Sequence, residues 1–361
     1  MAKYLSVKHL LQRRIGHGDY LLKEFPTDRE LSAEFECDTR TARKAVAELI
    51  QEGLLVRQRN GRPIVNVSLV SRKQQMRVAL LTVGYPTPFT ARWQRALEQA
   101  LGMRGGLLRP VSYRHMDDPI VRDTLEGFDG VFFGLPGEDP TDHLLRAIAR
   151  AERPVVFLDG DLSKHGFPSI WLAAPRAITL LLNHLVKRGH QKVAWLNTQP
   201  HVHVIQERFA AWQEWSSRGG RGGRVIDEPV ASFESPLERA YHAALRALDT
   251  GGFDASALLC CTSAAAKGVY RALHDRGLKV GQDLAVCSAD DGAGEAQYLV
   301  PSLTSLQDPD PAPYLSVCLD WIERGGSDWQ GPLLVQPKHV PIFLGESTNV
   351  PNGHSREQTG N

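Results

Sequence analysis

Cysteine is scarce in this chain of 361 residues, which contains five, an odd number. No two of them have the Cys-x-x-Cys spacing of a redox or zinc site. Few cysteines in an odd number are typical of a protein from a reducing compartment. Long apolar runs are also missing, so no stretch of about 20 apolar residues is available to cross a membrane. The first residues, MAKYLSVKHLLQRR, lack the apolar core of a signal peptide. We therefore expect a cytoplasmic protein with no membrane partner.

Net charge is nearly absent, because 42 Lys and Arg stand against 41 Asp and Glu. This balance hides an asymmetry. Residues 1–75 hold 14 basic and 9 acidic side chains, whereas the other 286 residues hold 28 basic and 32 acidic ones. A basic segment attached to a mildly acidic body indicates that only this segment meets a polyanion such as nucleic acid.

Two helices with clear start signals are predicted in the basic segment. Thr27 and Glu30 form a capping box directly after Pro26, so a helix should begin there. Asp38 or Thr39 caps the next helix. Its apolar face combines residues at helical spacing, namely Ala42, Ala45, Val46, Leu49 and Ile50, and its opposite face carries Arg40, Arg43 and Lys44. Gly53 should end this second helix.

A hairpin with a basic tip is predicted to follow. Residues 54–59 and 63–67 have strand character around Asn60-Gly61, a dipeptide suited to a tight turn with positive φ angles. Arg57, Arg59 and Arg62 surround that turn. A cationic helix beside a cationic ribbon is the arrangement that contacts phosphates on both sides of a DNA groove. The alternative is an ordinary solvated charged face, which the co-occurrence of helix, cap and hairpin disfavours.

These segments, FPTDRELSAEF, TRTARKAVAELIQEGLL and NGRPIV, resemble the winged helix-turn-helix domain of GntR-type transcription regulators. The resemblance implies that Arg29, Thr41 and Arg43 contact phosphates or bases of double-stranded DNA, with Gly61 at the wing tip. The full set of predicted DNA-contacting residues is Arg29, Thr39, Arg40, Thr41, Arg43, Lys44, Arg59, Asn60, Gly61 and Arg62. We expect this domain to occupy residues 1–67, and the short polar stretch 68–76 to be a linker.

The remaining residues predict an α/β architecture of doubly wound, parallel sheets. Short apolar runs alternate with helical patterns, and the predicted strands are 78–83, 130–135, 154–158, 192–196, 257–260 and 284–287. Ligands of such folds bind beyond the carboxyl ends of the strands. The strand ends are therefore where binding residues are expected.

Several predicted strand ends carry polar groups suited to a hydroxyl-rich small molecule. They include Asp159 and Asp161, Thr262-Ser263, and Asp290-Asp291. Arg208 is expected to begin a helix that carries aromatic residues on from Phe209. Each Asp has the alternative role of capping the helix that follows it. We expect Arg208 and Asp290 to line one cleft, although they come from distant sequence regions.

The segments PVVFLDGD, HLVKRGHQKVAWLN, ERFAAW, VCSADDG and PSLTSL resemble the effector-binding domain of LacI/GalR-type regulators, which share a two-lobed fold with periplasmic sugar-binding proteins. The resemblance covers residues 77–348, with 349–361 as a polar tail, and implies a homodimer that binds a sugar or nucleobase. The implied effector-binding residues are Phe89, Asp159, Arg208, Phe233, Thr262, Ser263, Asp290 and Asp308. A GntR-type head on a LacI-type body resembles the arabinose repressor group, which implies a repressor of a carbohydrate-utilisation operon controlled by a sugar or related polyol.

The sequence gives only weak support to other functions. His201 and His203 form a His-x-His pair without a recognisable third ligand, so no metal is expected. The glycine-rich stretch 219–223 lacks the Gly-Lys-Ser/Thr end of a phosphate loop, and more simply connects a helix to a strand. No nucleophile–base pair accompanies Asp290-Asp291, so neither an enzyme nor a cofactor is expected. The alternatives are an enzyme fused to a DNA-binding head, which would turn over its ligand, and a binding module with a vestigial head.

Overall fold

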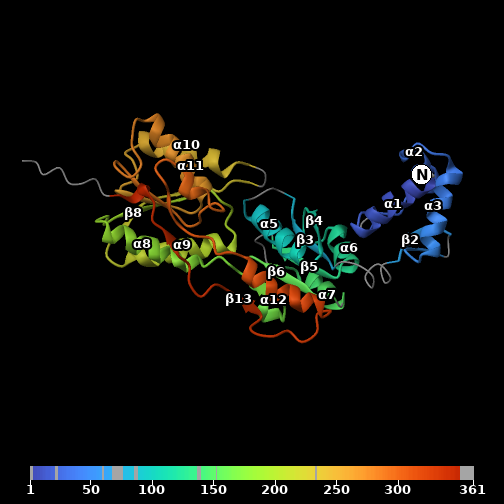
Figure 1. Cartoon of the computed structure of the whole chain (residues 1–361). Coiled ribbons are helices and arrows are strands. Elements are labelled where there is room, and N and C mark those ends of the chain that lie inside the picture. The colour runs from blue at the N-terminus through green and yellow to red at the C-terminus, as the bar shows by residue number, and fades with distance from the viewer. Residues whose placement is uncertain are drawn as a thin grey trace, which may run out of the picture. The chain divides into compact units, whose positions relative to one another are not determined.

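The computed structural model describes residues 3–20, 23–58, 61–66, 76–84, 88–135, 140–151, 153–231 and 234–349, without the side chains of residues 88 and 89 (Figure 1). The chain divides into two compact units, each assembled from separate segments. The first contains Met1–Gly84, Trp93–Ile170 and Ala312–Leu334, and the second contains Tyr85–Arg92, Trp171–Pro311 and Val335–Asn361. Most of the linker and the C-terminal tail predicted above lie outside the described residues. No described helix is both long and apolar enough to cross a membrane.

The N-terminal segment folds into three helices and a hairpin. These elements are α1 (Lys3–Gly16), α2 (Asp28–Glu34), α3 (Thr39–Gln51), β1 (Leu55–Arg57) and β2 (Pro63–Val65), with the two strands antiparallel. The buried side chains of α1 (Val7, Leu11 and Ile15) share one core with the apolar face of α3, of which Ala42, Ala45, Val46 and Leu49 are buried as predicted. This core fixes α3 and leaves its charged face in solvent.

Both helix starts follow the predicted cap signals. The backbone N–H of Thr27 donates to Glu30 Oε2 at 2.7 Å while the Thr27 hydroxyl accepts from Glu30 N, so the predicted capping box is confirmed. Asp38, rather than Thr39, caps α3 by accepting from Thr41 N at 2.8 Å. Gly53, with φ 79°, follows the end of α3 as expected, since glycine adopts this left-handed conformation without strain. The wing strands are shorter than predicted, because regular pairing covers only residues 55–57 and 63–65.

The first unit also contains a mostly parallel six-stranded sheet. Its strands are β3 (Arg77–Val83), β4 (Leu107–Tyr113), β5 (Gly130–Gly134), β6 (Val155–Leu158), β7 (Ser169–Ile170) and β13 (Leu334–Val335), in the order β13-β7-β6-β5-β3-β4. Its helices are α5 (Pro88–Met103), which belongs to this unit from Trp93 onward, α6 (Pro119–Gly127), α7 (Asp142–Arg150) and α12 (Ala312–Glu323). The buried residues of α6 and α7 share one core with alternate residues of β3, β5 and β6, so these helices cover the same sheet face.

The second unit repeats this design with the strand order β14-β12-β11-β10-β8-β9. Its strands are β8 (Val193–Asn197), β9 (Gly222–Asp227), β10 (Ala257–Cys260), β11 (Ala285–Ser288), β12 (Thr304–Leu306) and β14 (Ile342–Phe343), of which only β14 is paired antiparallel. Its helices are α8 (Ile178–Lys187), α9 (His203–Ser217), α10 (Pro236–Asp249) and α11 (Ser263–Asp275). Four short 3-10 helices complete the described elements, at Ser163–His165, Pro175–Ala177, Glu295–Tyr298 and Glu346–Thr348.

Helices cover both faces of this second sheet. Leu258 and Cys260 of β10 face a core shared with α10 and α11, whereas Ala257 and Leu259 face the core shared with α8 and α9. Figure 1 shows these two helix pairs on opposite sides of the strands. A strand that is buried on both faces has a continuous run of apolar residues in its sequence. For this reason the predicted bounds of β10 agree with those in the structure. The predicted doubly wound α/β fold is confirmed.

Candidate functional site

The charged face of α3 is open to solvent. Arg40, Arg43 and Lys44 are exposed. Arg43 Nε lies 3.0 Å from Asp28 Oδ2 at the start of α2, and the arginine side chain is 69% exposed. An ion pair this exposed contributes at most about 1 kcal/mol, so Arg43 can exchange Asp28 for a phosphate or a base at little cost. Lys44 is held within the domain instead, with its ammonium group 3.8 Å above the Tyr4 ring.

The other predicted residues of the head differ in their availability. Arg29 is exposed in the first turn of α2, whereas Thr39 and Thr41 are half-buried. The Thr41 hydroxyl donates to Asp38 Oδ2 at 2.8 Å, so it already has a partner in the helix cap. Arg29, Arg40, Arg43 and Lys44 are therefore exposed, and of these Lys44 already contacts the Tyr4 ring.

The wing tip combines a glycine with arginines. Gly61 has φ 81° and its carbonyl accepts from Arg57 Nη1 at 2.9 Å. Arg62 Nη1 lies 2.6 Å from Glu24 Oε2, a contact that sequence spacing did not indicate. Arg59 and Asn60, which were also predicted to contact DNA, lie outside the described residues.

In the second unit, the structure brings Arg208 and Asp290 together. Arg208 is buried, and its Nη1 donates to Cys261 O at 2.8 Å and lies 3.6 Å from Asp290 Oδ2. The expectation that Arg208 begins a helix was wrong. Helix α9 begins at His203, since Val202 is the last extended residue before it, and Arg208 projects from its interior toward the strand ends.

Asp290 also holds the loop in which it lies. Its Oδ1 accepts from Ser263 N at 3.0 Å and from Gly292 N at 3.3 Å, so the supporting role considered from sequence is present alongside the contact with Arg208. Thr262 caps α11 by accepting from Ala265 N, and its hydroxyl also accepts from Gln199 Nε2 at 3.4 Å. In the first unit Asp161 likewise has a local partner, because its Oδ1 accepts from Ser163 N at 2.9 Å.

A second charged cluster lies at the end of β12. Asp308 N donates to Asp291 Oδ2 at 3.2 Å, and Arg92 Nη1 lies 3.5 Å from Asp308 Oδ2. Burial, reinforced by the negative charge of Asp290 and opposed by Arg92, raises the pKa of Asp308 to about 7. Asp291 was expected only as one of the polar groups at a strand end, and Arg92 was not among the predicted site residues. Arg92 gave no sequence signal beyond its position near a helix start, because its partner is far away in the chain.

Asp159 belongs to the first unit and is held separately. It follows β6 with φ 65°, its N–H donates to Ile170 O at 2.9 Å, and its Oδ2 accepts from Trp93 Nε1 at 2.9 Å. A non-glycine residue with positive φ is uncommon, and such strain concentrates at binding sites. The Phe89 side chain and Phe233 lie outside the described residues.

The histidine pair has acidic partners within the protein. His201 Nε2 lies 2.8 Å from Asp227 Oδ2, and His203 Nε2 lies 3.1 Å from Glu207 Oε1. Within the described ranges, no group of three or more His, Cys, Asp or Glu side chains is placed to hold a metal ion. The glycine-rich stretch 219–223 leads from α9 into β9, which its last two residues begin, as its sequence indicated.

Comparisons with known proteins match both parts of the chain. Residues 3–65 match the bacterial regulatory proteins of the gntR family, and residues 182–312 match a periplasmic binding protein-like domain. The regulator MalR of Streptomyces coelicolor is 25% identical over 304 residues, covering 76% of this chain and 86% of its own length. The regulator AscG and the lactose operon repressor, both of Escherichia coli, are each 26% identical, and the match spans about half of their length (46% and 48%).

Solved structures share the fold at low sequence identity. A LacI family regulator from Enterococcus faecium with bound ribose aligns with a TM-score of 0.63 and 18% identity, covering 76% of this chain and 98% of that one. The lac repressor dimer bound to operator and the anti-inducer ONPF aligns with a TM-score of 0.61 and 18% identity, covering 87% and 91%. These likenesses establish the two-lobed architecture.

Proposed function

We propose that this chain, which joins a GntR-type helix-turn-helix domain to a LacI-like, periplasmic-binding-protein-like domain, is a ligand-responsive DNA-binding transcription regulator. The observation that carries the proposal is the presence in one chain of two separate polar surfaces. One is the exposed cationic face of α3, and the other is the Arg208–Asp290 pair at the strand ends of the second unit.

The DNA partner is a double-stranded operator. Helix α3 is rigidly packed through its apolar face, so its arginines are held on a fixed support. Arg40 and Arg43 from this helix, with Arg29 from α2, would enter the major groove or contact its phosphates. The wing residues around Gly61, with Arg59 and Arg62, would contact the neighbouring backbone. Thr39, Thr41, Lys44 and Asn60 complete the proposed surface.

The effector is a sugar or related polyol. Arg208 offers donors and Asp290 offers acceptors beside each other, the combination that pairs with vicinal hydroxyl groups. Asp308, Thr262 and Ser263 belong to the same unit, and the other proposed residues are Phe89, Asp159 and Phe233. Ribose is bound in the Enterococcus relative and lactose in an Arthrobacter one, which supports this ligand class.

The proposed mechanism is linkage between the two surfaces in a cytoplasmic homodimer. An effector that binds one conformation of the sensor more tightly than the DNA-competent one must change operator affinity by the same factor. The lac repressor dimer, which shares the fold, supports a homodimer. The proposed domain limits are 1–67 for the DNA-binding domain, 68–76 for the linker, 77–348 for the effector-binding domain and 349–361 for the tail. Relatives named as regulators support a repressor without enzymatic activity.

Two measurements test this function. A thermal-shift screen of sugars, sugar alcohols and nucleosides identifies the effector, because a ligand at 100 times its Kd stabilises the fold by about 2.7 kcal/mol. Selection from random DNA duplexes then identifies the operator. Turnover of the bound ligand would overturn the proposal in favour of an enzyme, and ligand binding without salt-sensitive DNA affinity would leave only a ligand-binding module.

A further inference from the structure

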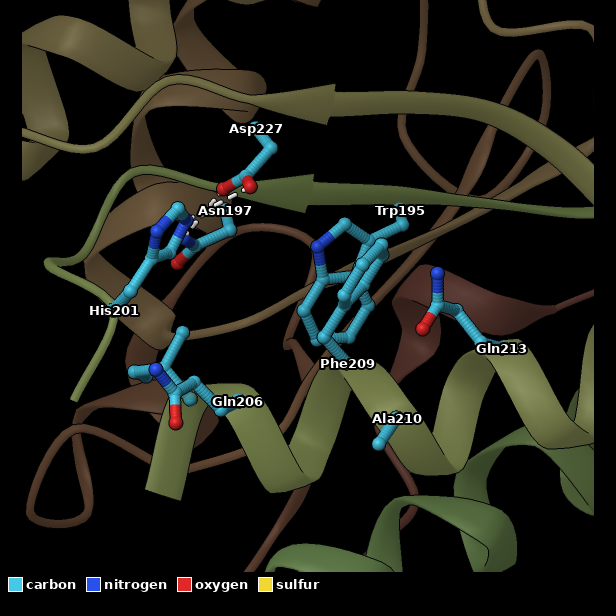
Figure 2. Close-up of a pocket in the computed structure, with 9 residues that line it drawn as sticks. Trp195, Asn197, His201, Gln206, Phe209, Ala210, Gln213 and Asp227 are labelled. Atoms are coloured by element: carbon cyan, nitrogen blue, oxygen red, sulfur yellow. Dashed lines mark hydrogen bonds and ion pairs between the residues drawn. The ribbon is translucent and has the colours of Figure 1, made fainter. Parts of the chain in front are cut away.

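A basic surface lies at the edge of the second sheet where β8 and β9 start. The two strands are adjacent and parallel, so the segments that lead into them, 187–192 and 218–221, lie side by side, and Val193 N donates to Arg221 O at 2.9 Å. Figure 2 shows α9 running against the direction of both strands, so its last turn meets the same edge. We call six cationic residues of these segments and of β9 the α9–β9 basic surface: Lys187, Arg188, Lys192, Arg218, Arg221 and Arg224.

The cations of this surface contact few acids. Glu214 accepts from Arg218 Nη2 at 2.5 Å and from Arg176 Nη2 at 2.6 Å, so two guanidinium groups share one carboxylate. Asp254 pairs with Lys192 at 3.2 Å. Six of the 28 basic side chains of residues 76–361 thus lie on this surface, and only two of the 32 acidic ones pair with them. The surface is strongly positive although the body as a whole carries excess negative charge.

The other four cations of the surface form no ion pair with another described residue. Arg221 lies 5.6 Å from the centroid of the Trp215 ring, and Arg224 Nη1 donates to Thr250 Oγ1 at 2.9 Å. These neutral contacts hold the two guanidinium groups in place. They leave the positive charge uncompensated and several N–H donors of each group available.

The three arginines of this turn are separated by glycines alone. Gly219 and Gly220 have φ of 119° and 65°, and a Cβ atom at Gly220 would meet no other atom within 4 Å. Residues 222–223, before Arg224, are glycines as well. Because no side chain stands between the arginines, a large polyanion can approach their guanidinium groups closely.

We propose that the α9–β9 basic surface binds the phosphate backbone of double-stranded DNA without sequence preference. Arginine pairs with phosphate through two parallel N–H groups, and a duplex presents its phosphates on the outside. The glycine-rich turn carries no further side chain that could read base edges in a groove, so the contact should be independent of sequence. It is separate from the contact proposed for α3 and goes beyond the function proposed above.

Two other polyanions fit this surface less well. A single strand binds by stacking its bases on exposed aromatic rings, whereas Trp215, the ring next to Arg221, is buried. An anionic membrane is bound most firmly when apolar side chains insert beside the cations, but segments 187–192 and 218–224 contain no apolar side chain. Intact duplex DNA is therefore the partner that the surface favours.

The test uses the full-length protein with Arg40→Ala and Arg43→Ala in the head, and fluorescence anisotropy of a labelled duplex of random sequence. We expect a Kd of about 10⁻⁴–10⁻⁶ M, the range of sequence-independent DNA binding. Adding Arg188→Glu and Arg218→Glu should weaken binding about tenfold or more. It should also lower the slope of log affinity against log salt concentration by about two, since each phosphate contact contributes about 0.9. Both side chains are exposed, so the fold should be unaffected, which circular dichroism verifies.

The matched control adds Arg239→Glu and Arg271→Glu instead. These exposed arginines lie on α10 and α11, which share the core on the other face of the sheet, and the change in net charge is the same. The proposal requires this control to leave duplex affinity and the salt slope unchanged.

Four outcomes overturn the proposal. The head variant fails to bind the random duplex with a Kd below about 1 mM. Arg188→Glu with Arg218→Glu leaves the binding unchanged, or weakens it no more than the control does. Single-stranded DNA of the same length binds more tightly than the duplex, or vesicles containing phosphatidylserine do. Failure of the function proposed above is distinguishable, because it appears as a wild-type protein that binds operator no better than random DNA.

Discussion

Replacing Asp290 by asparagine is the sharpest test of the proposed effector site. Asp290 has two roles in the structure, because Oδ1 supports the loop through Ser263 N and Gly292 N while Oδ2 lies 3.6 Å from Arg208 Nη1. Asparagine keeps the size of the side chain and one carbonyl oxygen for the two backbone donors. It removes the negative charge that faces Arg208 and the proposed ligand. Asp290→Asn therefore separates ligand binding from loop support, whereas Asp290→Ala removes both.

The magnitudes follow from the contacts. A charge-assisted hydrogen bond to a ligand contributes about 1.5–3 kcal/mol, so Asp290→Asn should weaken effector binding roughly 10- to 150-fold. Asp290→Ala should in addition lower the free energy of unfolding by about 1–3 kcal/mol, since it leaves the backbone N–H groups of Ser263 and Gly292 without their acceptor. Arg208→Ala should weaken effector binding to a similar extent. Operator affinity should be unchanged in all three variants, because the residues proposed to contact DNA lie outside the second unit.

The assay is calorimetric titration of the folded variants with the effector, together with thermal melting and operator binding by fluorescence anisotropy. Lys192→Ala is a suitable control, because it also removes a cation from an ion pair of the second unit, but an exposed one with Asp254. Normal effector affinity in Asp290→Asn and Arg208→Ala would refute the site. If Asp290→Ala lowers the melting temperature but leaves the effector Kd unchanged, Asp290 supports the loop and does not bind the effector.

Three further predictions concern the head and the buried acid cluster. Arg43→Ala should weaken operator binding by roughly 1–3 kcal/mol if Arg43 contacts a base. If Arg43 contacts a phosphate instead, the variant should show a weaker dependence of operator affinity on salt concentration. An unchanged operator affinity in anisotropy titrations would exclude both roles. Gly61→Val should disturb the wing, since φ of 81° is unfavourable for a β-branched residue, and wild-type DNA binding would show that the wing is not needed. Because the pKa of Asp308 is raised to about 7 in the folded state, its contribution to stability is largest below about pH 4 and is lost as the pH rises to about 7. Urea unfolding of Asp308→Asn should lack this part of the pH dependence, and an identical pH profile would contradict the raised pKa.

Much of the fold was predictable because local signals and burial agreed. The capping box at Thr27 marks the start of a helix, and the wholly apolar run of β10 indicates a strand buried on both faces. Both elements were predicted. Six observed strands were not predicted with bounds. Four of them, β7, β12, β13 and β14, are only two or three residues long, and the other two are β4 and β9, of which β9 was expected only as the strand that follows the glycine-rich stretch 219–223. Both lie at sheet edges, where only one neighbour pairs with them, and β9 has exposed residues such as Arg224 and Val225 that give no continuous apolar run.

The candidate site was less predictable, because it depends on contacts between distant residues. Sequence indicated that Asp290 and Arg208 lie at opposite elements of one site, and the structure brings them together. The position of Arg208 inside α9 was not visible, since no cap residue marks the start of that helix. The pairing of Arg92 with Asp308 depends on the tertiary fold alone.

The central claim is that effector binding and operator binding are coupled, and the most direct measurement is the reciprocity of the two affinities. Operator Kd is measured with and without saturating effector, and effector Kd is measured with and without saturating operator. We predict that both change by the same factor, of about 5- to 150-fold. Operator affinity that is identical with and without an effector bound at the Arg208–Asp290 site would contradict the account.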